Sequence, residues 1–175
     1  MKIKLAKSMI ENEEGTNHVL IEIPDSLSYV SANIAISLPS GLSRSKNENG
    51  FYEDEFATIF IDNISGKLQL LIELFTEEPV SCGKEMIVVN LTYKDKEGQE
   101  THINESIPLL IVHEDEMDEL IVDKEVIDLV KRFLTGELMA EEDEDKDNGF
   151  VNIRPKILQI NNQLSELEKK YRIDF

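Results

Sequence analysis

The sequence has one cysteine and half as many basic residues as acidic ones, and each shortage excludes a class of site or ligand. A single cysteine, Cys82, can form no internal disulfide and supply no multi-cysteine zinc site. The 18 lysines and arginines stand against 36 aspartates and glutamates, which gives a net charge of −18. Such an acidic surface repels phosphate backbones and anionic lipids. We therefore predict that the protein binds neither nucleic acid nor membranes. The expected partner is another protein or a second copy of the chain.

Long apolar segments are also missing. No run approaches the roughly 20 apolar residues that span a bilayer. Residues 1–7 alternate lysines with apolar side chains and lack the apolar core of a secretory signal. These two absences predict a cytoplasmic protein. At 175 residues, the chain has room for one domain and an appendage.

Patterns that carry catalysis are absent as well. His18, His102 and His113 lie in three separate segments, and none has the spacing of a metal-binding pair. No serine lies in a Gly-x-Ser-x-Gly motif, and the Gly83-Lys84 pair lacks the further glycines of a phosphate-binding loop. The sequence therefore predicts a protein that is not an enzyme and that needs no cofactor.

Strict alternation of apolar residues is the strongest positive signal. Between residues 30 and 38 every even position is apolar and every odd one is small or polar, and Pro39 and Gly41 follow. A strand repeats its facing every two residues, so these even positions should share one buried face. They are Val30, Ala32, Ile34, Ile36 and Leu38.

Similar patterns recur along the first two thirds of the chain and predict seven or eight short strands. The segments are 1–5, 18–23, 55–62, 67–75, 85–93 and 101–112. Leu71 and Phe75 fall on the outer face of their strand, so we expect that face to be partly covered. Residues 40–54 are rich in serine, asparagine and glycine, which predicts a long surface loop. The fold class predicted is mainly β, an immunoglobulin-like antiparallel β-sandwich over residues 1–112.

After residue 112 the spacing becomes helical, and residues 113–175 are predicted to form an acidic helical region of about two helices. Asp123 can cap a first helix whose apolar residues recur at three- and four-residue spacing. A second helix is predicted from about Asn152, with Pro155 in its first turn. Its apolar stripe is the predicted partner-binding site: Ile157, Ile160, Leu164, Leu167 and Tyr171. The stripe could instead pack on the chain's own sheet or first helix, or pair with its copy in a dimer.

The acidic run at 141–149 suggests a calcium loop as an alternative. Asp143, Asp145 and Asp147 would supply oxygen ligands at loop positions one, three and five. However, Asn148 stands where the loop needs glycine, and Arg154 stands where it needs a bidentate glutamate. A solvated acidic linker is the simpler interpretation.

Three stretches together resemble a known module. They are Ile-Ala-Ile-Ser-Leu-Pro-Ser-Gly-Leu at 34–42, the strand at 58–64 with the Ser-Gly that follows it, and Val-Asn-Leu-Thr-Tyr-Lys-Asp-Lys-Glu-Gly at 89–98. With the helical tail, this order is similar to the immunoglobulin-like sandwich that follows the von Willebrand A domain in bacterial proteins. The resemblance implies a bacterial protein. It carries no metal site, because the Asp-x-Ser-x-Ser motif of that domain is missing.

These observations predict a non-enzymatic protein-interaction or assembly module that uses its sheet edges, the 40–54 segment and the terminal helices. Two alternatives stay open: a calcium-responsive module that uses the 141–149 segment, and a structural subunit that oligomerises through its C-terminal helix.

Overall fold

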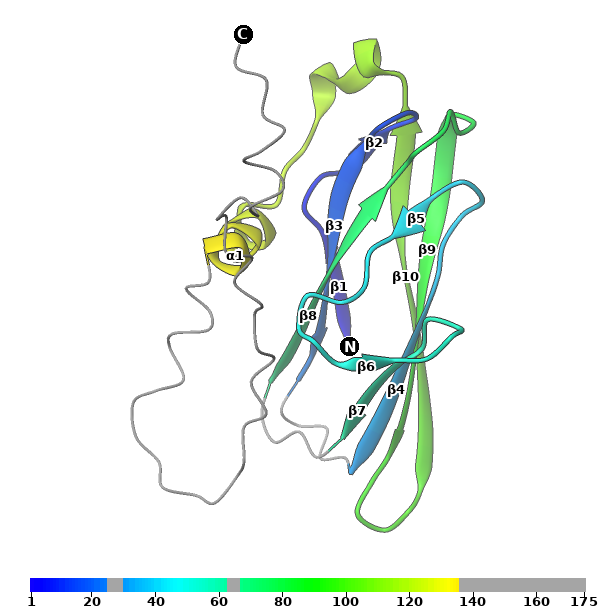
Figure 1. The fold of residues 1–175 in the computed structure, drawn as a ribbon, viewed down its shortest axis with the longest axis vertical. Coiled ribbons are helices and arrows are strands. Elements are labelled where there is room, and N and C mark those ends of the chain that lie inside the picture. The colour runs from blue at the N-terminus through cyan, green and yellow to red at the C-terminus, as the bar shows by residue number, and fades with distance from the viewer. Residues whose placement is uncertain (25–29, 63–66, 136–175) are drawn as a thin grey trace, which may run out of the picture. The chain divides into compact units, whose positions relative to one another are not determined.

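The computed structural model describes residues 1–24, 30–62 and 67–135, which form two sheets and a helix (Figure 1). The four-stranded sheet has the order β1 (Lys2–Leu5), β3 (Thr16–Ile23), β8 (Leu68–Phe75), β5 (Ser43–Arg44). The six-stranded sheet has the order β2 (Met9–Glu11), β10 (Glu100–Val112), β9 (Gly83–Lys94), β4 (Ser31–Ser37), β7 (Ile59–Asp62), β6 (Tyr52–Glu53). Neighbouring strands are antiparallel, except that β2 is parallel to β10.

The core lies between the two sheets and consists of the side chains that the alternation placed inward. Fully buried members come from both sheets: Val19, Ile21, Ile34, Ile59, Ile61, Leu70, Ile72, Leu74, Ile87 and Val89. Two sheets that each present an apolar face can remove it from water only by packing on each other, and this burial is the main stabilising term of the fold.

The N-terminal strand is divided between the sheets, because β1 pairs with β3 and β2 pairs with β10. Asn17, which is fully buried, fixes the crossing between them. Its side-chain oxygen accepts a hydrogen bond from the Lys7 backbone N–H at 3.0 Å, and its amide donates to the carbonyls of Lys7 and Met9. A first strand split in this way, with β3 and β8 in one sheet and β4, β9 and β10 in the other, is the immunoglobulin-like arrangement. The predicted fold class is confirmed.

Helix α1 (Lys124–Thr135) covers the outer face of the four-stranded sheet (Figure 1). It follows a short 3₁₀ helix, η1 (Glu114–Glu119). Asp123 caps α1 as predicted: its carboxylate accepts hydrogen bonds from the backbone N–H groups of Glu125 and Val126. The helix and sheet form a second apolar cluster of Ala6, Leu20, Leu71, Val126 and Leu129. The expected covering over Leu71 is therefore confirmed.

Three local expectations need correction. Val30 is 45% exposed because β4 begins only at Ser31, so it does not extend the buried row. Leu134, one of the apolar residues at helical spacing on which the first helix was predicted, is 82% exposed and does not join the packed face. Residues 40–54 are not simply a surface loop, since they contain β5 and β6 and bury Leu42 and Asn47.

The second helix predicted near Asn152 lies outside the described residues, and the predicted domain boundary at residue 112 stays a prediction. Within the described part of the chain there is no helix with the length and apolarity needed to cross a membrane.

Candidate interaction surface

The outer face of the six-stranded sheet is built from side chains that strand pairing aligns in rows. Pairing of β6, β7, β4, β9 and β10 places five residues in one row: Tyr52, Phe60, Asn33, Thr92 and His102. The same pairing sets out three further rows, two residues apart along each strand. They are Ala35, Asn90 and Asn104; then Ser37, Val88 and Ser106; then Met86 and Pro108.

These four rows, which we name the uncharged face, contain no aspartate, glutamate, lysine or arginine. The charged residues of these strands' outer side lie in the rows on either side of the uncharged face. Lys84 lies past one end, and Asp62, Lys94 and Glu100 form the row at the other. In a chain of which 31% is charged, an uncharged area on a sheet face distinguishes it from the rest of the surface. Charged residues are depleted at the centres of protein interfaces, and this face has the same depletion.

Several polar side chains on the uncharged face are paired with each other. The Asn104 amide donates to the Asn90 side-chain oxygen at 2.5 Å. The Thr92 hydroxyl and His102 Nδ1 are 2.9 Å apart in a further hydrogen bond. Because these side chains are already ordered by their hydrogen bonds, they lose less conformational entropy when a partner binds.

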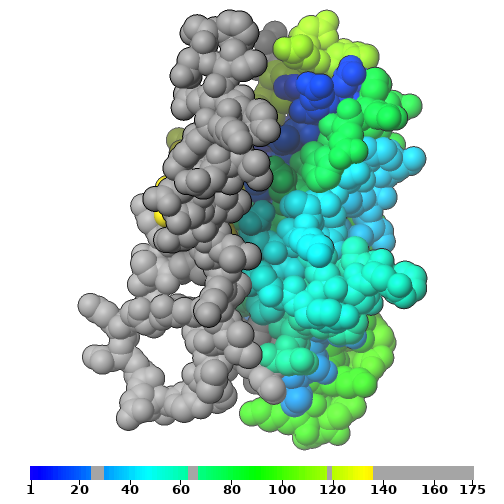
Figure 2. Space-filling model, in the orientation of Figure 1, coloured from blue at the N-terminus to red at the C-terminus, as the bar shows by residue number. Residues whose placement is uncertain are grey.

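An aromatic border lies along the β6–β7 side of the uncharged face. The rings of Tyr52 and Phe60 lie 5.7 Å apart at an interplanar angle of 42°. Tyr52 is 70% exposed, and Phe56, in the turn between β6 and β7, is 81% exposed. This cyan-to-green segment projects at the right-hand side of Figure 2. Exposed aromatic side chains of this kind are the residues that most often dominate interface energies.

The turn that carries Phe56 is fixed by hydrogen bonds. The Asp54 carboxylate accepts from the backbone N–H groups of Phe56 at 3.0 Å and Thr58 at 2.8 Å. Ala57 adopts a left-handed conformation with φ of 59°, which is unfavourable for a residue with a side chain. The Arg44 guanidinium donates to the Ala57 carbonyl at 2.6 Å and so stabilises this backbone.

Arg44 also forms an ion pair with Glu53 at 2.9 Å, in which both side chains are less than a tenth exposed. The other oxygen of Glu53 accepts hydrogen bonds from the backbone and side-chain nitrogens of Asn47, each at 2.6 Å. Burial by itself raises the pKa of Glu53, but the hydrogen bonds from Asn47 and Arg44 outweigh it and the pKa is lowered. The 40–54 segment is therefore a polar scaffold for the aromatic border.

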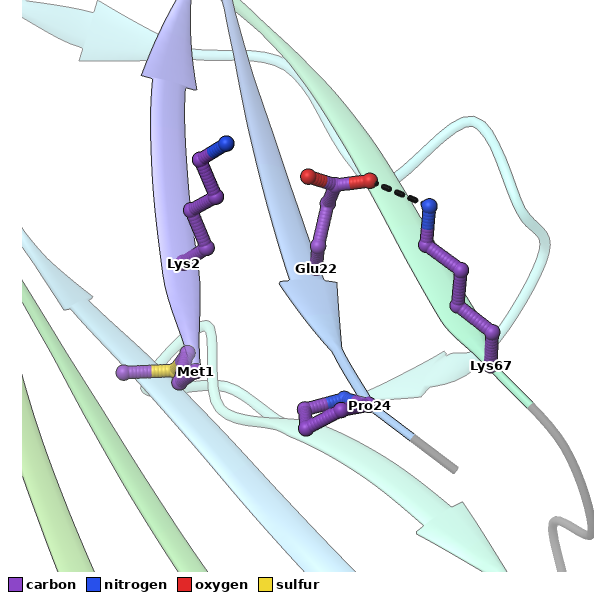
Figure 3. Close-up of a pocket in the computed structure, with 5 residues that line it drawn as sticks. All are labelled: Met1, Lys2, Glu22, Pro24 and Lys67. Carbon is purple, nitrogen blue, oxygen red and sulfur yellow. Dashed lines mark ion pairs between the residues drawn. The ribbon is translucent and has the colours of Figure 1, made fainter. Parts of the chain in front are cut away.

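A pocket on the four-stranded sheet contains a second charged group (Figure 3). Glu22 contacts the Lys67 amine at 2.6 Å and the Lys4 amine at 3.3 Å, and it accepts from the Gln69 amide at 3.0 Å. The contact with Lys67, and then those with Gln69 and Lys4, lower the pKa of Glu22 to about 2. A carboxylate held ionised in this way is a poor proton donor and a weak base, so the pocket is poorly suited to acid–base catalysis.

Lys4 extends this network to the helix. Its amine lies 2.5 Å from a carboxylate oxygen of Glu125 in the first turn of α1. The contact with Glu125, reinforced by Glu22, raises the pKa of Lys4. The network thus links β1, β3, β8 and α1.

The predicted partner-binding and calcium-binding residues stay predictions. The partner-binding stripe Ile157, Ile160, Leu164, Leu167 and Tyr171, and the calcium candidates Asp143, Asp145 and Asp147, all lie outside the described residues. Among residues 1–24, 30–62 and 67–135 there is no group of three or more histidine, cysteine, aspartate or glutamate side chains placed to hold a metal ion. The cysteine, Cys82, is exposed.

The uncharged face was missed, although part of its signal is in the sequence. The outward positions of the predicted strands near 30–38, 85–93 and 101–112 are mostly small or amide side chains. Only the strand order shows that these three strands lie side by side and that their outward residues form one surface. Of the aromatic border, Tyr52 lies in the segment predicted as a loop. Phe56 and Phe60 lie in the predicted strand 55–62, which in the structure begins only at Ile59, so Phe56 falls in a turn instead.

The fold and this surface define an immunoglobulin-like β-sandwich without a recognisable catalytic constellation among its described residues. No protein-family model and no curated protein sequence matches the chain. Several solved structures resemble it distantly.

The major pilin subunit BcpA of Bacillus cereus matches with a TM-score of 0.44 and 9% identity, over 63% of this chain and 41% of that one. Self-complemented MyfA, the major subunit of Myf fimbriae from Yersinia enterocolitica, matches with a TM-score of 0.35 and 11% identity, over 62% and 98%. The periplasmic chaperone SfaE matches with a TM-score of 0.31 and 9% identity, over 65% and 57%. This chain thus spans about two fifths of the Bacillus pilin, and likeness at this level carries no argument about function.

Two expectations change in the light of these comparisons. The strand order confirms the immunoglobulin-like sandwich, but the resemblance to the region after a von Willebrand A domain gains no support from the comparisons. The predicted cytoplasmic location is contradicted, because the matched proteins are pilin and fimbrial subunits and a chaperone described as periplasmic. We withdraw that location; the missing apolar leader on which it depended describes only the printed sequence. That the chain is not an enzyme stays a prediction.

Proposed function

We propose that this chain is a protein-interaction or assembly module that binds its partner through the uncharged face and its aromatic border. The observation that carries this proposal is the placement of charge. A molecule with a net charge of −18 presents four adjacent rows of uncharged side chains on one sheet face. Covering such a face costs less solvation free energy than covering a charged one, because its four rows contain no carboxylate, ammonium or guanidinium group.

The aromatic border is a second reason to place partner binding at this surface. Tyr52 and Phe56 are exposed, yet their backbone is fixed by the Asp54 turn and by the buried Arg44–Glu53 pair. On a fixed backbone, an aromatic side chain has only two torsions to order on binding, and it buries a large apolar area.

Photo-crosslinking from defined positions tests the proposal. A photoreactive amino acid at Asn33 or Ser106, both exposed on the uncharged face, should crosslink to one defined protein in the native host. The same amino acid at Glu97, exposed in the β9–β10 turn, is the matched control and should not. The crosslinked protein is then purified and its binding measured against wild type and Asn90→Asp. Equal crosslinking from all three positions, or from none, would refute the proposal.

A further inference from the structure

We infer that the partner covered by the uncharged face is a second copy of this chain, packed face to face around a two-fold axis. This inference rests on the proposed function and names its partner.

The charge of the whole chain restricts how two copies can meet. Two molecules that each carry −18 repel one another, and most approaches bring carboxylates together. The uncharged face is different, because its four rows contain no carboxylate. Two copies that meet through this face keep their acidic groups at the rim, where water and salt screen them.

The charged residues beyond the face favour one orientation. Lys84 leaves one end with a charge of +1. The opposite row holds Asp62, Lys94 and Glu100, whose charges sum to −1. A two-fold axis that lies between the sheets and perpendicular to the strands reverses the strand direction of one copy. It therefore places the Lys84 end of each copy over the acidic end of the other, and the two contacts are identical by symmetry.

The size of the face suits a modest dimer. From the row of Lys84 to the row of Glu100 the sheet presents six rows, about 34 Å at roughly 3.4 Å per residue. Its width is two strands at the row of Met86, three at the next two rows and five at the row of Thr92, or roughly 9 to 24 Å. With the two flanking charged rows included, the footprint is about 500–650 Å² per copy, below the roughly 800 Å² of a standard interface and in the size range of transient complexes. We therefore expect a weak, reversible dimer.

The sequence offers nearly isosteric variants for a test on the full chain. Asn90→Asp and Asn104→Asp each replace an amide by a carboxylate in the central rows. In Asn90→Asp the acceptor that Asn104 uses is retained, so the local hydrogen bond survives. Gln99→Glu adds the same charge in the exposed β9–β10 turn and is the matched control. Each copy brings its new charge to the dimer, so every substitution counts twice.

Sedimentation equilibrium from low to several hundred micromolar protein, with circular dichroism to confirm folding, measures the effect. We expect wild type and Gln99→Glu to dimerise alike, and each central variant to weaken dimerisation about tenfold or more, because like charges are then buried opposite each other. If one central variant does not fold, the other and Ser106→Asp supply the same test.

A wild-type chain that stays monomeric throughout this range overturns the inference, and so does a dimer that the central variants leave unchanged. These outcomes are separable from failure of the proposed function. A monomeric wild type whose uncharged face crosslinks to a different protein refutes the second copy but supports an interaction module. A monomer without any face-specific crosslink refutes both.

Discussion

Replacing Glu22 by glutamine should destabilise the protein at neutral pH and make little difference in acid. Glu22 is paired with Lys67 and Lys4, and these contacts lower its pKa from 4.5 to about 2. A carboxyl whose pKa is lower in the folded state stabilises the fold above its unfolded pKa. That contribution is lost as the pH falls from about 4.5 through about 2.

The magnitude follows from the same contacts. The difference between a pKa of 4.5 and one of about 2 corresponds to at most about 3.4 kcal/mol. The carboxylate is only 10% exposed and Lys4 only 12%, but the Lys67 side chain is 52% exposed and therefore screened by water. Glutamine also keeps an oxygen that can accept hydrogen bonds from these lysines. We expect a loss of about 1–2 kcal/mol at pH 7.

Urea unfolding of wild type and Glu22→Gln at a series of pH values between 7 and 2 checks this prediction. The difference in unfolding free energy between the two proteins should shrink below pH 4.5 and approach zero near pH 2. Comparing two proteins at each pH cancels the titration of the other carboxyls. Glu97→Gln, in an exposed turn, serves as the control and should match wild type throughout. A constant difference across the whole series would refute the electrostatic explanation, and no difference at pH 7 would refute the contribution itself.

Three other substitutions, with Leu134→Ala as a control for one of them, probe the stability of the fold by urea unfolding. Arg44→Ala leaves the Glu53 carboxylate buried without its ion-pair partner and should cost about 3 kcal/mol; a change below 1 kcal/mol would contradict the buried pair. Val126→Ala opens a cavity beneath α1 and should cost about 2 kcal/mol, whereas Leu134→Ala, at an 82% exposed position, should cost almost nothing. Asn17→Ala strips hydrogen bonds from the β1–β2 crossing and should cost about 2–4 kcal/mol, with faster hydrogen exchange there; unchanged exchange would show that the crossing holds without it.

The strands that could be predicted are those whose alternation is uninterrupted. Residues 68–74 and 87–93 repeat apolar side chains at every second position. Both segments lie in strands, β8 and β9, and most of these side chains are buried. Leu71 is an apolar residue on the outer face of its strand, which indicated that this face is covered, and α1 covers it. The short strands β5 and β6 contain only two residues each, so no periodicity can be recognised in them. β2, with three residues, has too little alternation to be distinguished from a turn.

The candidate surface could not be predicted from the sequence either. Its outward residues are small, polar or aromatic and come from segments far apart in the chain, so their common property is invisible without the strand order. The Arg44–Glu53 pair joins residues nine positions apart through a local fold that composition had suggested to be a loop.

By itself the sequence determined that the chain forms sheets before residue 112 and a helix capped by Asp123 after it. Apolar side chains spaced two residues apart share one face only in a strand, and side chains spaced about 3.6 residues apart share one face only in a helix. It also fixed the acidity that makes an uncharged surface exceptional. The tertiary structure alone decided which strands are neighbours, since pairing depends on contacts between distant segments. That pairing collects Asn33, Asn90, Thr92 and Asn104 into one uncharged face.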